Sequence, residues 1–121
     1  DEPENRSVSE VLDARAFCDT CPPDSMFHLV NITTTIPEGK GTYFYWRSQE
    51  WNRLDHIIVS GHLLDPGNPF RLADQRLNVI EESFLFHKNE YGTSVPFSTY
   101  AKDYEGGYSD HLPVSITLLA E

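Results

Sequence analysis

The stretch that decides the fold is Leu54-Asp-His-Ile-Ile-Val-Ser60, which carries the clearest β-strand pattern in the 121-residue chain. Its run of β-branched residues favours extended backbone. Because successive side chains of a strand point to opposite faces, Asp55, Ile57 and Val59 share one face of it. We therefore expect a strand that begins with a carboxylate on the same face as two aliphatic residues.

Further strand-like segments lie on both sides of this stretch. They are rich in β-branched or aromatic residues, and the turns between them contain Gly, Pro, Asn and Asp. In the last segment, apolar side chains alternate onto one face from Leu112 to Leu118. The expected strands are residues 27–35, 42–46, 77–86, with an irregularity near Glu81-Glu82, and 111–119, while residues 89–107 are expected to be mostly loop.

A short amphipathic helix is expected at residues 7–16. Ser7 and Glu10 have the spacing of a capping box, and apolar residues then recur at helical spacing. Pro22 and Pro23 would end it, because proline cannot continue a helix. One helix followed by several strands predicts an α/β (α+β) domain in which a mixed sheet has helical cover.

Composition and charge limit the function classes. The chain is 39% hydrophobic and 23% charged, as in ordinary globular domains, and no apolar run reaches the roughly 20 residues of a membrane span. Its net charge of −10 and the lack of a basic stripe weigh against tight, non-specific DNA binding. The polar N-terminus has neither an initiator Met nor a signal peptide's apolar segment, as expected of a processed or cut chain.

The two cysteines lie in Phe17-Cys-Asp-Thr-Cys-Pro22. A structural zinc site needs about four ligands, and there is no second cysteine pair. A local disulfide or two ordinary thiols are both compatible with Cys18 and Cys21, so the redox compartment stays open.

A second stretch that could carry chemistry is Gly106-Gly-Tyr-Ser-Asp-His-Leu-Pro-Val114. Adjacent residues of extended backbone point their side chains apart, so Asp110 is poorly placed to orient His111. A catalytic histidine needs an acceptor on one ring nitrogen to fix its tautomer, and Asp55 is the natural candidate. Asp110 is then available as a hard oxygen ligand for a metal ion or its water.

Simpler interpretations stand beside this one. An Asp-His pair at the start of a strand is commonly a turn or surface feature, and Asp55 could pair with Arg53 instead. The remaining histidines and the paired aromatic residues are interpreted as structural, since aromatic residues are more often core than a stacking platform. These residues are His28, His56, His62, His87, Tyr43, Phe44, Tyr45 and Trp46.

Three motifs in order change this balance: Gly41-Thr-Tyr43, then Trp51-x-Arg-Leu-Asp-His-Ile-Ile-Val-Ser60, then Tyr108-Ser-Asp-His-Leu-Pro-Val114. Their order and spacing resemble the closing part of the endonuclease/exonuclease/phosphatase (DNase I-like) superfamily. In that family the Asp matching Asp55 orients the catalytic His, which matches His111. The resemblance also implies that His111 acts at the scissile phosphate and that Asp110 lies at the metal ion or its water.

The resemblance implies a particular architecture and an incomplete site. Family members form a four-layer α/β/β/α sandwich, of which residues 1–121 would be the C-terminal half. Asp1-Glu2-Pro3 and the helix from Ser7 resemble the segment directly after the family's Gly-Asp-Phe-Asn motif. That motif, the metal-binding Glu and a second catalytic His belong to the first half. Mg²⁺ or Mn²⁺ would therefore be bound mostly by that half, and the 121-residue piece alone is expected to be inactive.

The resulting hypothesis is the C-terminal part of a divalent-metal-dependent phosphoester hydrolase. Its acidic charge favours a small-molecule or lipid phosphoester slightly over DNA. The piece is expected to pair with its own N-terminal half or to self-associate, because exposed apolar faces rarely stay uncovered. The alternatives are a non-catalytic binding module or degenerate homologue that keeps the scaffold, and an unrelated β-rich carbohydrate-binding or adhesion domain. The compartment is not fixed, with a secreted or periplasmic location among the options.

Overall fold

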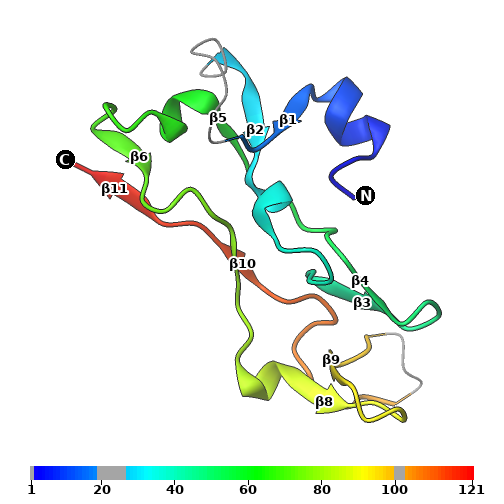
Figure 1. Cartoon of the computed structure of the whole chain (residues 1–121). Helices are drawn as coiled ribbons and strands as arrows, with labels where there is room; N and C mark the ends of the chain where they lie inside the picture. The colour runs from blue at the N-terminus through cyan, green and yellow to red at the C-terminus, as the bar shows by residue number, and fades with distance from the viewer. Residues whose placement is uncertain (1, 19–26, 100–102) are drawn as a thin grey trace.

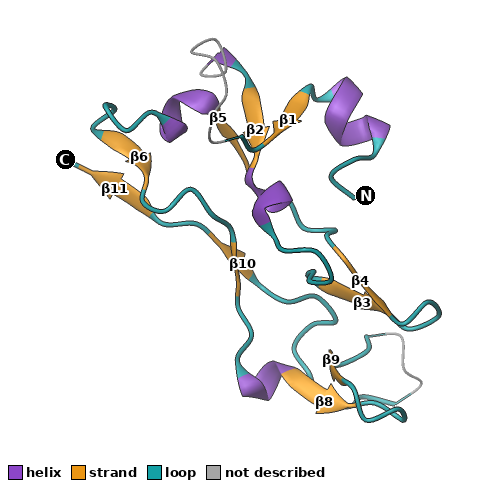
Figure 2. Ribbon diagram, viewed as in Figure 1, coloured by secondary structure: helices purple, strands orange, loops and turns teal. Residues whose placement is uncertain are grey.

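The computed structural model describes residues 2–18, 27–99 and 103–121, which form short strands joined by loops and short helices (Figures 1 and 2). The strands are β1 (Ala14–Ala16), β2 (Leu29–Asn31), β3 (Tyr43–Tyr45), β4 (Glu50–Asn52), β5 (Ile58–Ser60), β6 (Phe70–Leu72), β7 (Asn78–Val79), β8 (Phe86–Lys88), β9 (Ser94–Pro96), β10 (Val114–Ser115) and β11 (Leu118–Ala120). The helices are the π-helix η1 (Ser7–Val11) and the 3-10 helices η3 (Ile32–Thr35), η4 (Gly61–Leu64) and η5 (Ser83–Leu85).

A mixed three-stranded sheet stands at one end of the molecule (Figure 1). Its order is β1-β2-β5, with β1 parallel and β5 antiparallel to β2. Val30 in β2 pairs with Val59 in β5, and both side chains are buried. The described residues thus combine strands of both orientations with little helix, a mixed α/β content dominated by strands.

A long, interrupted antiparallel ladder runs from this end towards the other (Figure 1). It joins β6 to β11 and β7 to β10. Between and beyond these pairs, the Ala73 N–H donates to the Thr117 carbonyl (2.9 Å) and the Ile80 N–H to the Pro113 carbonyl (2.8 Å). The ladder holds the C-terminal segment in one register and so determines where the residues just before β10 lie.

Two hairpin-like pairs, β3–β4 and β8–β9, occupy the other end of the molecule (Figure 2). Phe44 pairs with Trp51 across β3–β4, and their rings pack edge to face with the ring centroids 5.4 Å apart. The loop between β9 and β10 contains the Asp110-His111 stretch and reaches back to β3. This arrangement brings a C-terminal loop beside residues in the middle of the sequence.

The hydrophobic core lies where the three-stranded sheet meets the ladder. Side chains from the two parts pack together there, and burial of this apolar surface is the main favourable contribution to folding. The buried members are Val30, Ile32, Ile36, Val59, Leu72 and Leu77, with Val79, Val114 and Ile116 packed against them.

The helix expected at residues 7–16 is wrong beyond Val11. Asp13 has a positive φ of 50°, which ends the helix, and Ala14 then begins β1 beside Leu29. The expected capping box is also wrong, because the helix begins at Ser7 with Arg6 in the N-cap position. Burial of Ala14 and its pairing with β2 outweigh the local helical pattern.

The expected strands are present but shorter than their sequence patterns. Residues 32–35 are 3-10 helix, and the 77–86 segment breaks at the anticipated irregularity near Glu81-Glu82. Residues 89–107, expected to be mostly loop, include β9. After β2, the Thr35 hydroxyl donates to the Ile32 carbonyl and accepts from the Leu77 N–H, so side-chain hydrogen bonds replace a strand ladder there.

Cys18 is disulfide-bonded, and Cys21 lies outside the described residues. Among the helices of the described ranges, none has the length and apolar character that a bilayer crossing requires.

Candidate active site

The structure brings Asp55 and His111 together. The His111 Nδ1 lies 2.7 Å from the Asp55 Oδ2, and the two side chains are 37% and 34% exposed. An ionised carboxylate only accepts hydrogen bonds, so the imidazole Nδ1 must be the donor. This tautomer leaves Nε2 as the nitrogen available to a substrate when the ring is neutral.

Strand β3 holds the loop that carries His111, a residue 56 positions after Asp55 in the sequence. Tyr43 forms an antiparallel bridge with His111, and the two rings lie 5.0 Å apart. Next to this bridge, the Leu112 N–H donates to the Thr42 carbonyl (2.7 Å). The loop that carries His111 is therefore attached to Tyr43 of β3 and to Thr42, the residue before that strand.

The alternative partner for Asp55 is engaged elsewhere. Arg53 contacts Glu4 at 2.6 Å and Glu2 at 3.6 Å, and its main-chain N–H also donates to the Glu2 carboxylate. The pairing of Asp55 with Arg53, open from sequence, is therefore wrong. The N-terminal segment neutralises Arg53 and leaves the Asp55 carboxylate to His111.

The loop before His111 is held by local contacts. The Ser109 hydroxyl accepts a hydrogen bond from the His111 N–H (3.0 Å). Gly106 has a φ of +89°, and a Cβ on Gly107 would overlap the side chain of Phe97. The main chain at Gly107 thus lies close against Phe97.

Asp110 lies at a bend directly before the His111 bridge and faces a cavity that His111 does not line. It lines a cavity of about 460 Å³ whose wall includes Tyr43, Phe44, Trp46 and His87. Within the described part of the chain, Asp110 takes part in no ion pair. Of the three candidate residues, Asp55 and His111 thus form a close pair, and Asp110, the residue before His111, faces this cavity.

The sequence interpretation missed the aromatic wall of this cavity. Trp46 is 64% exposed and Tyr45 37% exposed, so they are not core residues. His87 stacks on Phe97 with ring centroids 4.7 Å apart and lines the same cavity as Asp110. The charged Arg47 next to Trp46 in the sequence was a usable signal that the end of β3 is a surface position. In the structure the Arg47 guanidinium carbon lies 5.1 Å from the centroid of the Trp46 ring.

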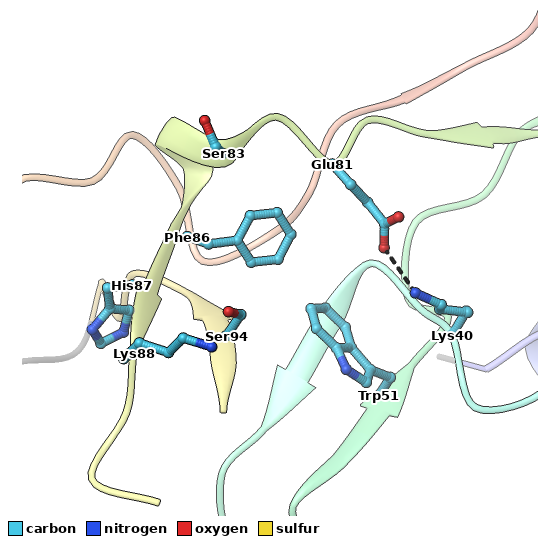
Figure 3. A pocket seen from close by; sticks show the side chains of 8 residues that line it. All are labelled: Lys40, Trp51, Glu81, Ser83, Phe86, His87, Lys88 and Ser94. Atoms are coloured by element: carbon cyan, nitrogen blue, oxygen red, sulfur yellow. Dashed lines mark hydrogen bonds and ion pairs between the residues drawn. The ribbon is translucent and has the colours of Figure 1, made fainter. Parts of the chain in front are cut away.

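A second cavity, of about 610 Å³, lies between β4 and β8 (Figure 3). Figure 3 shows the rings of Trp51 and Phe86 among the side chains that line it, with the ion pair of Lys40 and Glu81 (3.3 Å) to one side of them. Asp55, Asp110 and His111 are not among the residues that line it. His87 of β8 lines both cavities.

The described residues do not by themselves form a metal centre. No group of three or more His, Cys, Asp or Glu side chains in these residues is arranged to hold an ion. Asp110 offers one carboxylate, and Asp55 is occupied by His111. A hard cation such as Mg²⁺ takes about six oxygen ligands including water, more than the one free carboxylate that Asp110 offers.

The sequence pattern of the Endonuclease/Exonuclease/phosphatase family matches residues 1–120. The chain therefore belongs to the Endonuclease/Exonuclease/phosphatase family, which confirms the resemblance seen in the three motifs. This family is typically hydrolytic and generally depends on divalent metal ions. No curated protein and no solved structure matches the chain.

Proposed function

We propose that the protein is the C-terminal part of a divalent-metal-dependent hydrolase that cleaves phosphodiester or phosphomonoester bonds. The observation that carries this proposal is the contact of 2.7 Å between His111 Nδ1 and Asp55 Oδ2 in a chain of this family. A structural ion pair needs no particular ring tautomer, whereas acid–base chemistry needs one ring nitrogen engaged and the other free.

His111 is the residue that acts at the phosphate in this proposal. With Nδ1–H donated to Asp55, Nε2 accepts a proton when the ring is neutral and donates one when it is charged. The Asp55 carboxylate orients the ring, so that a charged imidazole would stabilise negative charge at a phosphate oxygen. Asp55 is a catalytic residue through its contact with the reacting imidazole, and Asp110 is the third proposed catalytic residue.

Metal dependence is part of the proposal. Asp110 would contribute one ligand to Mg²⁺ or Mn²⁺, or hold a water molecule in its shell, as its exposure to the 460 Å³ cavity allows. The remaining ligands would come mostly from the N-terminal half of the fold.

The proposed substrate is a small-molecule or lipid phosphoester rather than DNA. The cavity beside Asp110 has a volume in the range of about 300–1,000 Å³ that is typical of small-molecule sites. Its wall carries aromatic rings and acidic groups, and the chain has a net charge of −10, which disfavours a long polyanion.

The chain is proposed to be one half of a four-layer α/β/β/α sandwich, with helical cover completed by the other half. Large apolar side chains on the described surface support this view, among them Val11 (81% exposed), Phe27 (76%) and Phe70 (49%). Such surface is commonly covered by a partner. The piece alone is therefore expected to be inactive and to require its N-terminal half.

Replacing His111 with Ala in the intact protein tests the catalytic proposal. We expect turnover of a phosphodiester such as bis(p-nitrophenyl) phosphate to fall by roughly two to four orders of magnitude, the usual contribution of acid–base catalysis. Chelation with EDTA should stop hydrolysis in the unmodified protein, and added Mg²⁺ or Mn²⁺ should restore it.

His62→Ala is the matched control, because His62 is an exposed histidine that contacts Phe27 away from the pair. It should hydrolyse the ester at the unmodified rate. Equal turnover in the His111→Ala protein, or full activity in EDTA, would contradict the proposal. Metal-independent ligand binding without hydrolysis would favour a non-catalytic binding module.

A further inference from the structure

Two threonine hydroxyls hold the main chain of Asp55. The Asp55 N–H donates to the Thr42 Oγ1 (3.3 Å), and the Thr33 hydroxyl donates to the Asp55 carbonyl (3.0 Å). Asp55 precedes β5, so its peptide groups lie outside the strand ladder. The two side chains take the place that a neighbouring strand would fill for a residue inside a sheet.

Both threonines are completely buried, with 0% exposure. Thr33 Oγ1 also accepts a hydrogen bond from the Ile57 N–H (3.1 Å), and its own N–H donates to the Asn31 side chain (3.1 Å). Water cannot replace a hydroxyl at such a site without rearrangement, so loss of either one leaves a main-chain group unsatisfied. The position of Asp55 therefore depends on these two side chains.

Thr42 contacts both sides of the Asp55–His111 pair. Its side chain accepts the Asp55 N–H, and its carbonyl accepts the N–H of Leu112, the residue after His111 (2.7 Å). A third bond, from the Thr42 N–H to the Asn52 carbonyl (2.9 Å), fixes Thr42 against β4. One buried residue thus sets the separation of the two segments that carry the carboxylate and the imidazole.

We infer that Thr33 and Thr42 are positioning residues that hold the Asp55 carboxylate against His111 Nδ1. Their effect on turnover rests on the proposed function, whereas their effect on the geometry of the pair does not. A threonine was required by neither the strand pattern nor the charge balance, since valine has the same shape and a higher burial tendency. The requirement comes from the hydroxyl, which is the group that the test removes.

The test replaces each hydroxyl by a methyl group, in Thr42→Val and Thr33→Val. The readout is the proton resonance of a histidine Nδ1–H bonded to a carboxylate, which is strongly deshielded and is assigned by its loss in His111→Ala. We expect this resonance to weaken or disappear in both valine variants. Turnover of the same phosphodiester should fall roughly tenfold to a hundredfold, the range for a small misplacement of a catalytic group.

Two comparisons separate positioning from general stability. Thr42→Ser and Thr33→Ser keep the hydroxyl and lose a buried methyl, so the resonance should persist although stability falls. Thr35→Val removes an equivalent bond, from the Leu77 N–H to the Thr35 hydroxyl (3.0 Å), in a different part of the fold. It should lower stability and leave the His111 resonance unchanged.

An unchanged resonance in folded Thr42→Val and Thr33→Val proteins would overturn the inference, and so would its loss in a folded serine variant. If the valine variants do not fold, persistence of the resonance in the serine variants supports it. Loss of the resonance in the valine variants of a protein that hydrolyses no phosphoester would uphold the positioning role and refute the proposed function.

Discussion

At the residue scale, competition among charged side chains decides which partner Asp55 takes. Arg53 is two positions away but contacts Glu2 and Glu4, which come from the N-terminal segment. An arginine side chain in contact with Asp55 would compete with the His111 Nδ1–H for the carboxylate oxygen. The acidic residues before η1 therefore influence the candidate site although they do not contact it.

Gly41 gives the first residue-scale prediction. A Cβ at this position would overlap the main-chain carbonyl of Asn52, whose carbon would lie only 2.8 Å away, and main-chain atoms cannot rotate aside. Gly41→Ala should therefore displace Thr42 from β4 and lower the free energy of unfolding by roughly 1–3 kcal/mol, as overpacking does. Urea unfolding measures the change.

Gly39→Ala is the comparison for Gly41→Ala. Gly39 has a φ of +76°, and a Cβ added there would have open space around it. Alanine at this position would therefore strain the backbone without a steric clash. Gly39→Ala should lower the free energy of unfolding by about 1 kcal/mol and leave the His111 Nδ1–H resonance unchanged. A Gly41→Ala protein as stable as the unmodified one would show that β3 and β4 are not packed as described.

At the element scale, strands β2 and β5 are joined by a polar contact next to their ladder. Asn31 Nδ2 lies 3.0 Å from His56 Nδ1, and Asn31 Oδ1 accepts the Thr33 N–H. That second bond fixes the orientation of the Asn31 amide, so its NH₂ group faces His56 and the ring nitrogen must accept. His56, interpreted as structural from the sequence, links the two strands in its neutral form.

The stability of this link is expected to depend on pH. Burial lowers the pKa of His56 below its ordinary value of 6.5, and the negative charges of Asp55, Glu2 and Glu4 offset part of that shift. The unfolded chain therefore binds a proton at a higher pH than the folded one. The contribution of His56 to stability is fully present above pH 6.5 and is lost as the pH falls through the lowered folded-state pKa.

Urea unfolding at about pH 7.5 and about pH 5 measures this dependence on either side of the ordinary histidine pKa. The unmodified protein should lose more stability on acidification than His56→Gln, which has no titrating ring. His62→Gln, at an exposed position, should lose as much as the unmodified protein. Equal losses in the His56→Gln and unmodified proteins would contradict the role given to His56.

At the scale of the whole molecule, the described chain leaves apolar side chains on its surface. Val11 and Leu12 of the N-terminal helical region are 81% and 51% exposed, and Leu118 and Leu119 of β11 are 42% and 39% exposed. Scattered exposed residues are normal, but aliphatic pairs on two elements are what a half-sandwich would present to its other half.

We predict that the 121-residue chain either retains an N-terminal half non-covalently or self-associates. Size-exclusion chromatography with light scattering should give a mass above 13.8 kDa, and intact mass spectrometry after denaturation should separate any second polypeptide. Elution as a monodisperse monomer of 13.8 kDa would contradict the prediction. Added N-terminal half should restore phosphodiester hydrolysis if this piece alone is inactive.

The sequence by itself determined the family and a mixed α/β content, because both depend on local patterns. The 54–60 and 111–119 segments alternate as strands do, and the three motifs stand in the family's order. It also indicated which side chains are chemically suited to a site, namely Asp55, Asp110 and His111. The strand bounds and the helix at residues 7–16 were less well predicted, since pairing of Ala14 with β2 overrides local propensity.

Only the tertiary structure decided how these side chains meet. Contact between Asp55 and His111 depends on hydrogen bonds to Thr33 and Thr42, and no local pattern marks a threonine whose hydroxyl is used in this way. The exposure of Trp46 likewise depends on where β3 ends. Local sequence encodes backbone preference and side-chain chemistry, whereas buried hydrogen bonds between distant segments arise only once packing has excluded water from them.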